Sequence, residues 1–289
     1  MRRLLLALAI LVGLATTAAA QPRQDVAPFA APGTPVVIGQ GYDLPTKHYP
    51  KPRRINVQLP PGYDDPENKD RRYPVLYLLD GGAGWQDFAH IAGIVQQGGT
   101  WGISAPVILV GVESGDRKAE FTQPSSDPGE QKDFPTHGKA ETFRQFLVQD
   151  LKPAVDAAYR TDGTDGLIGE SLAALFVVDE FLTHPADFDR YIAISPSLWW
   201  DQQALAKSAQ ARLAAPNPPP RTLWLSIADE GGTMQSGVDL VVAALKANPN
   251  PAVTWTYAPY PAEKHSTIYH PAATRAIREV FPAPSDAQR

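Results

Sequence analysis

Apolar and polar residues along this chain follow two alternating patterns. Short, largely apolar runs followed by turn residues are typical of strands in a parallel sheet, and apolar residues three or four positions apart are typical of helices. The runs predict strands at Val36–Leu44, Arg54–Leu59, Tyr73–Leu79, Pro106–Val112, Thr164–Ile168, Tyr191–Ser195, Thr222–Ile227 and Thr254–Tyr257. The spaced pattern predicts helices at Phe88–Gln96, Glu141–Tyr159, Leu172–Thr183, Gln203–Leu213, Gly237–Ala247 and Ala273–Phe281. Strands that alternate with helices predict an α/β fold with a mostly parallel central sheet and helices on both faces.

Residues 1–20 lie outside this pattern. Arg2 and Arg3 precede the apolar run Leu4–Leu14, which is too short to span a bilayer comfortably, and Ala18–Ala20 supplies small residues for cleavage. We therefore expect a signal peptide at 1–20, a flexible lead-in at 21–35, one α/β domain at 36–283 and a tail at 284–289. Such a chain would be exported to the bacterial periplasm or secreted, with no membrane contact after cleavage.

Composition narrows the possible functions. The chain has no cysteine, which excludes disulfides, thiolate metal sites and a cysteine nucleophile. Its formal net charge of −5 argues against nucleic acid as a partner, because phosphate binding requires clustered Lys and Arg. A small molecule is the expected partner, and the sequence leaves the oligomeric state open.

The stretch Gly169-Glu170-Ser171-Leu172-Ala173 lies between a predicted strand and a predicted helix. A serine on such a turn presents its hydroxyl beyond the strand end, beside the free N–H groups of a helix N-terminus. The pattern is close to the G-x-S-x-G nucleophile elbow. Ala173 replaces the last glycine and adds one methyl group where helix and strand pass closely. The alternative for Ser171 is a serine that only caps an ordinary helix.

A nucleophilic serine needs a base and a third group that orients the base. His265 follows the last predicted strand, and the acidic pair Asp229 and Glu230 ends the strand after the elbow unit. This chain order of serine, acid and histidine is that of α/β-hydrolases. Because Asp229 and Glu230 are adjacent, only one of them would face His265. His90 has no matching loop position, and His270, at a helix start, is expected to be structural.

The oxygen of a tetrahedral intermediate needs two N–H donors. The backbone amide of Leu172 is the first expected donor, and the glycine turn Gly81-Gly82 is the expected source of the second. Two adjacent indoles are hard to bury together, so at least one of Trp199 and Trp200 is expected to line a pocket. The residues expected to line the substrate cleft are Trp85, Arg117, Phe121, Trp199 and Trp200, and the long polar segment Glu113–Ala140 is expected to be a functional loop. The chemistry needs no metal and no organic cofactor.

With these residues in place, the chain resembles the serine esterase family of α/β-hydrolases that includes enterochelin-esterase-like and trilactone-hydrolase-like enzymes. The resemblance extends from about Arg54 to Phe281. It rests on Tyr73-Pro-Val-Leu-Tyr-Leu-Leu-Asp-Gly81, Gly169-Glu-Ser-Leu-Ala173, Ser195-Pro-Ser-Leu-Trp-Trp200, and His265 followed by Tyr269-His-Pro271. It implies an α/β-hydrolase fold with Ser171 as nucleophile, His265 as base and Glu230, rather than Asp229, as the acid.

Together these features predict an exported serine hydrolase that cleaves a carboxylic ester through an acyl-enzyme. Three alternatives stay open. The first is an esterase for a siderophore trilactone, which requires a local basic pocket. The second is an acyltransferase that uses the same chemistry, and the third is a non-catalytic binding protein on the same fold. Transfer to alcohols separates the second from hydrolysis, and absence of covalent labelling by a fluorophosphonate identifies the third.

Overall fold

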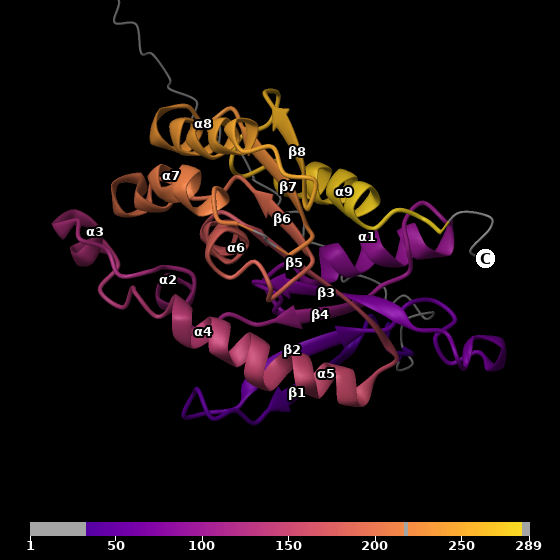
Figure 1. The fold of residues 1–289 in the computed structure, drawn as a ribbon. Coiled ribbons are helices and arrows are strands. Elements are labelled where there is room, and N and C mark those ends of the chain that lie inside the picture. Colours follow the sequence, from indigo (N-terminus) through magenta and orange to yellow (C-terminus); the bar gives the residue numbers. More distant parts are fainter. Residues whose placement is uncertain (1–32, 217–218, 285–289) are drawn as a thin grey trace, which may run out of the picture. The chain divides into compact units, whose positions relative to one another are not determined.

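One sheet of eight strands runs through the described part of the chain, residues 33–216 and 219–284 of this computed structural model (Figure 1). The strands lie in the order β1-β2-β4-β3-β5-β6-β7-β8. The first three in this order pair antiparallel, and every pairing from β4 to β8 is parallel. The mostly parallel sheet confirms the predicted α/β-hydrolase fold class. The strands are β1 (Gln40–Leu44), β2 (Arg53–Gln58), β3 (Tyr73–Leu79), β4 (Ile108–Val112), β5 (Thr161–Glu170), β6 (Arg190–Ile194), β7 (Arg221–Ala228) and β8 (Val253–Tyr260).

Helices cover both faces of this sheet (Figure 1). On one face α1 and α9 pack in a single buried cluster that includes Ile91 and Ile277. On the other face α4, α5, α6, α7 and α8 share a larger cluster that includes Phe143 and Phe176. The central strands are therefore buried on both sides, as their apolar runs predicted. The helices are α1 (Phe88–Thr100), α2 (Arg117–Glu120), α3 (Pro128–Asp133), α4 (Ala140–Phe146), α5 (Lys152–Ala158), α6 (Leu172–Thr183), α7 (Trp200–Leu213), α8 (Gly232–Ala247) and α9 (Tyr269–Val280), with a 3-10 turn at Pro66–Asn68.

The predicted helix Glu141–Tyr159 is interrupted by a π-helical turn at Leu147–Leu151, between α4 and α5. Pro153 lies just after this turn and has no N–H for the regular helical pattern. A wider turn next to proline is a common way for a helix to continue past the missing hydrogen bond. The segment Glu113–Ala140 also differs from the predicted loop, because it contains the short helices α2 and α3.

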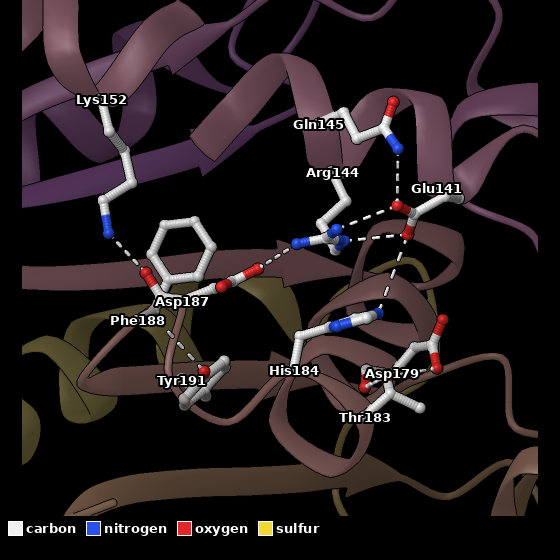
Figure 2. Close-up of polar contacts among 10 residues, drawn as sticks. All are labelled: Glu141, Arg144, Gln145, Lys152, Asp179, Thr183, His184, Asp187, Phe188 and Tyr191. Atoms are coloured by element: carbon white, nitrogen blue, oxygen red, sulfur yellow. Dashed lines mark hydrogen bonds and ion pairs between the residues drawn. The ribbon is translucent and has the colours of Figure 1, made fainter. Parts of the chain in front are cut away.

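A network of polar contacts fastens this interrupted helix to the connection between α6 and β6 (Figure 2). Arg144 bonds both Glu141, at 2.8 Å, and Asp187, at 2.7 Å. Lys152 donates a hydrogen bond to the carbonyl oxygen of Asp187. His184, the last residue of the α6 unit, lies 3.8 Å from the same Glu141 carboxylate. The network therefore holds the C-terminal end of α6. The first turn of α6 lies at the candidate site described below.

Several predicted segments lie outside the described residues, namely the signal peptide at 1–20, most of the lead-in and most of the tail. Gly33–Val37 has no regular secondary structure, and the described residues from Ile38 onward form one compact unit. Among the helices of the described ranges, none has the length and apolar character needed to cross a bilayer.

Candidate active site

Ser171 is placed on a tight turn between β5 and α6. Its backbone has φ 62° and ψ −120°, in the left-handed region that costs a residue other than glycine about 1–3 kcal/mol. The turn is held from both sides. The Ser171 N–H donates to Ile194 O at 3.0 Å, and its carbonyl accepts hydrogen bonds from the N–H groups of Leu175 and Ser197. Backbone strain held this firmly is found mainly at functional positions.

The first position of the elbow, Gly169, is a glycine because the start of α6 passes directly over it. A Cβ atom added at Gly169 would lie 2.8 Å from both the Cβ and the carbonyl carbon of Ala173. Ala173 is fully buried. The methyl group that departs from the G-x-S-x-G pattern is therefore accommodated by the missing side chain at Gly169.

We predict that Gly169→Ala lowers the free energy of unfolding by about 1–3 kcal/mol, because two methyl groups cannot occupy this space without a backbone shift. Urea unfolding measures the effect. The double variant Gly169→Ala/Ala173→Gly removes the opposing methyl and should recover part of the loss. Equal destabilisation in the single and double variants would contradict this explanation.

The structure brings Ser171, His265 and Glu230 into one line. Ser171 Oγ lies 3.0 Å from His265 Nε2, and His265 Nδ1 lies 3.1 Å from Glu230 Oε1. The atoms of the second contact are close, yet neither has a well-aligned hydrogen bond among the described residues. The contact is therefore bent. Asp229, the alternative acid, instead pairs with Lys264 at the surface. The geometry thus favours Glu230 over its neighbour.

The two partners of this contact shift each other's pKa in the directions that a base and its orienting acid require. The Glu230 carboxylate raises the pKa of His265 above its ordinary value, against the opposing effect of burial. Burial alone would raise the pKa of Glu230, but the neighbouring polar groups of His265 and Ser195 bring it below its ordinary value. The Glu230 side chain is 7% exposed and the His265 side chain 44% exposed. An ionised, covered carboxylate therefore stands behind an accessible imidazole.

The segment Ser195-Pro196-Ser197 packs beside Ser171 and the end of β7. Ser195 has φ 45°, and its hydroxyl accepts a hydrogen bond from Ala228 N–H at 3.2 Å, at the end of the strand that leads to Glu230. Ser197 Oγ lies 3.4 Å from Ser171 Oγ. Both serines are buried. The sequence motif marked this segment as specific, but its spacing alone gave no sign that the two hydroxyls contact the acid loop and the nucleophile.

Glu170, between the glycine and the serine of the elbow, is a site residue that sequence reasoning did not identify. Its Oε1 lies 3.8 Å from His265 Nε2, and its side chain is 23% exposed. Burial raises the pKa of Glu170 to about 7, while the positive charges of His265 and Arg117 oppose the shift. The histidine therefore has carboxyl groups on two sides. Glu170 was overlooked because the elbow pattern allows any residue at its position.

We predict that Glu170→Gln stabilises the fold at pH 8 by about 2 kcal/mol and has little effect near pH 5. The native carboxyl has a raised pKa, so the folded chain binds more protons than the unfolded chain between the ordinary value of 4.5 and about 7. Wild-type stability consequently falls as pH rises through this range, and the amide removes that loss. Urea unfolding at both pH values measures it.

Glu141→Gln is the matched control for this prediction. The hydrogen bond from Arg144 lowers the pKa of Glu141 below its ordinary value, so removing this carboxylate should reduce stability at pH 8. A Glu170→Gln variant that is destabilised at pH 8 would contradict the proposed cost of its buried charge.

The three amides expected to bind the oxyanion differ in availability. The Leu172 N–H, in the first turn of α6, has no acceptor among the described residues. The Gly81 N–H donates to Val112 O at 2.8 Å, and the Gly82 N–H donates to Gln86 Oε1 at 2.8 Å. Gly81 thus does not fit the predicted role. A Cβ there would lie 2.4 Å from the Cα of Gly111, so this glycine serves close backbone packing. The acceptor of the Gly82 N–H, by contrast, belongs to the side chain of Gln86, which can move.

The five residues expected to line the substrate cleft do not lie together. Phe121 and Trp200 are buried, and both line a cavity of 170 Å³ beside α6 and α7 whose lining includes neither Ser171 nor His265. Trp199 is half-buried and packs against its neighbour at 5.8 Å. The Trp200 indole donates a hydrogen bond to Gln123 O and is part of the core. Both indoles of the pair are therefore at least partly covered. Trp85 is exposed.

Arg117, the fifth of these residues, is held by an acid. Its guanidinium donates to Asp80 Oδ2 at 2.9 and 3.2 Å. Asp80 follows β3 and has φ 52°. The positive charge of the same guanidinium opposes the rise in the pKa of Glu170 that burial causes. Its positive charge there is largely matched by the Asp80 carboxylate.

The fold is shared with solved structures of hydrolases. An IroE-like serine hydrolase from Shewanella oneidensis matches with a TM-score of 0.74 at 24% identity, over 84% of this chain and 80% of that one. Siderophore hydrolase EstB from Aspergillus nidulans matches with a TM-score of 0.74 at 19% identity, over 88% and 100% of the two chains. At such low sequence identity, the structural match shows a common fold and nothing more specific.

Sequence comparison adds two esterases. Ferri-bacillibactin esterase BesA of Bacillus subtilis is 33% identical over 150 residues, 47% of this chain and 51% of the relative. Siderophore triacetylfusarinine C esterase of Aspergillus fumigatus is 28% identical over 174 residues, 56% of each chain. The chain thus spans about half the length of the curated relatives it matches. The model of the Esterase family, described as "Putative esterase", matches residues 46–267. Because that range exceeds half of the sequence, the chain belongs to this esterase family.

Proposed function

We propose that this chain is a serine hydrolase of carboxylic esters, in which Ser171 is the nucleophile, His265 the base and Glu230 the orienting acid. The observation that carries the proposal is the continuous line from Ser171 Oγ through His265 to Glu230, with separations of 3.0 and 3.1 Å. Membership of the esterase family supports the reaction class. A serine that merely caps a helix would need neither the left-handed backbone nor the aligned histidine.

In the proposed reaction, Ser171 Oγ attacks the ester carbonyl carbon while its proton passes to His265 Nε2. The negative oxygen is bound by the Leu172 N–H, with Gly82 N–H as the second donor once Gln86 releases it. Collapse of the intermediate expels the alcohol, which takes the proton from His265. A water molecule, deprotonated by the same nitrogen, then cleaves the acyl-enzyme and releases the acid.

We infer a siderophore ester as the substrate class. The names of BesA and of the triacetylfusarinine C esterase support this choice. The charges around the site bear on which form of such an ester is the better substrate. The carboxylates of Asp87 and Asp80 both act to raise the pKa of Glu170, and Arg117 is paired with Asp80. An acidic surrounding disfavours a polyanionic ferric complex, so we expect the metal-free ester to be the better substrate.

The experiment is a set of ester assays on the purified chain, using p-nitrophenyl acetate and a catecholate trilactone in its metal-free and ferric forms. Hydrolysis of the trilactone at a higher kcat/KM than the acetate supports the siderophore class, and faster cleavage of the ferric form would contradict the electrostatic argument. Hydrolysis of the aryl ester alone would leave the esterase and remove the siderophore. Added alcohols test for acyl transfer.

Export of the chain stays a prediction from residues 1–20. Its test is the N-terminal sequence of the protein recovered from the periplasm and medium of expressing bacteria. A chain that begins at Gln21 in those fractions supports cleavage after Ala20. Recovery of an uncleaved chain with the cells contradicts it.

A further inference from the structure

A cluster of one carboxylate and two imidazoles lies on the sheet face covered by α1 and α9. Asp87 is the residue before α1, His90 is in the first turn of α1, and His270 is in the first turn of α9. One ligand-type atom from each of the three side chains lies within 4.8 Å of the others. His90 Nδ1 is 3.5 Å from Asp87 Oδ1, and the rings of His90 and His270 meet edge to face at 4.3 Å. None of the three takes part in the proposed ester hydrolysis.

The donor set matches a zinc-type ion. Two imidazole nitrogens and one carboxylate oxygen form a common protein ligand set for Zn²⁺, with a fourth position left to water. Bond lengths of about 2.0–2.2 Å in a tetrahedron place ligand atoms about 3.4 Å apart, so the side chains must close only slightly. Both imidazoles are exposed and therefore free to turn. One ligand just before α1, a second in its first turn and a third on α9 would hold such an ion between two helices.

The surroundings favour a cation. In the described part of the chain no Lys or Arg side chain lies within 4.0 Å of the Asp87 carboxylate, which contacts only His90. The Asp87 N–H donates to Asp80 O at 3.0 Å, so a second acidic residue is adjacent. The Arg117 guanidinium is bound to Asp80. This half-buried carboxylate thus lacks the permanent positive partner that such groups usually have.

We propose that Asp87, His90 and His270 form a binding site for one divalent transition-metal ion of the zinc type, which links α1 to α9. Because the site uses none of the residues of the proposed ester chemistry, it stands whether or not that chemistry is correct. The ion joins the two helices that cover one face of the sheet, so its binding stabilises the folded chain.

The test is calorimetric titration of the untagged, chelator-treated chain with Zn²⁺ in a buffer that does not bind metal. We expect one equivalent to bind to the wild type and a melting temperature a few degrees higher with the ion. His90→Ala and His270→Ala should each weaken binding at least about 10–100-fold. His184→Ala removes a partly exposed histidine at the end of α6, and this variant should bind Zn²⁺ like the wild type. Binding of Cu²⁺ followed by electron paramagnetic resonance should show two nitrogen ligands.

Three results would overturn the proposal. The first is no binding of Zn²⁺ by the wild type at micromolar concentration. The second is unchanged binding by both His90→Ala and His270→Ala. The third is loss of binding in His265→Ala alone, which would place the ion between His265 and Glu170, 3.8 Å apart. Because His90 and His270 are exposed, the metal-free variants should melt close to the wild type, and this melting check separates lost ligands from lost folding.

Discussion

Ser171→Ala is expected to abolish covalent labelling by a fluorophosphonate and to reduce ester turnover by about 10⁴–10⁶-fold. The variant removes the hydroxyl that lies 3.0 Å from His265 Nε2 and would form the acyl-enzyme. When a nucleophilic serine is lost, the remaining groups provide only the residual rate of oxyanion binding and positioning. Labelling followed by mass spectrometry and kcat/KM for an aryl ester measure the two effects.

The neighbouring hydroxyl supplies the control. Ser197 Oγ lies 3.4 Å from Ser171 Oγ but makes no hydrogen bond with His265 among the described residues. Ser197→Ala should therefore keep the label, with a smaller loss of rate. Full turnover by Ser171→Ala would disprove the proposed mechanism, and labelling that moves to Ser197 would reassign the nucleophile.

Glu230→Gln is expected to lower kcat/KM by about 10²–10³-fold and to shift the acid limb of its pH profile to lower pH. In a triad with a buried, well-aligned acid, the corresponding change costs about 10⁴-fold. Here the contact with His265 is bent and the imidazole is accessible, so we expect less. Because the carboxylate raises the pKa of His265, its loss lets the base stay neutral in more acidic solution.

Asp229→Asn is the matched variant, since it changes the adjacent carboxylate that pairs with Lys264. It should leave both kcat/KM and the pH limb near wild type. A large effect in Asp229→Asn, with none in Glu230→Gln, would reverse the assignment of the acid. A rate loss in Glu230→Gln without a shift of the pH limb would point to a structural role instead.

The fold was largely readable because its signals are local. Apolar runs such as Tyr73–Leu79 identify strands buried on both faces, and the elbow at Gly169–Ala173 fixes where a strand becomes a helix. The order of serine, acid and histidine then places three loops at one edge of the sheet. The π-helical turn before Pro153 could not be foreseen, since a proline in a helical pattern has several possible outcomes.

The parts of the site that escaped prediction depend on contacts between distant segments. Whether Phe121 faces a cleft or the core is decided by α4 and α6, which pack against it. Spacing alone left Asp229 and Glu230 open, because the direction of each side chain after β7 is not encoded in a short pattern, and only the family resemblance favoured Glu230. Gly81 was assigned to the oxyanion because glycine serves both ligand approach and close packing, and here Gly111 opposite it requires the second.

The residues that carry the proposed chemistry follow successive neighbours in the sheet. Ser171 follows β5, Ser195 follows β6, Glu230 follows β7 and His265 follows β8, the last strand in chain order. A folding intermediate in which β8 has not yet docked holds a serine without its base. Recovery of ester hydrolysis during refolding therefore cannot precede the docking of β8.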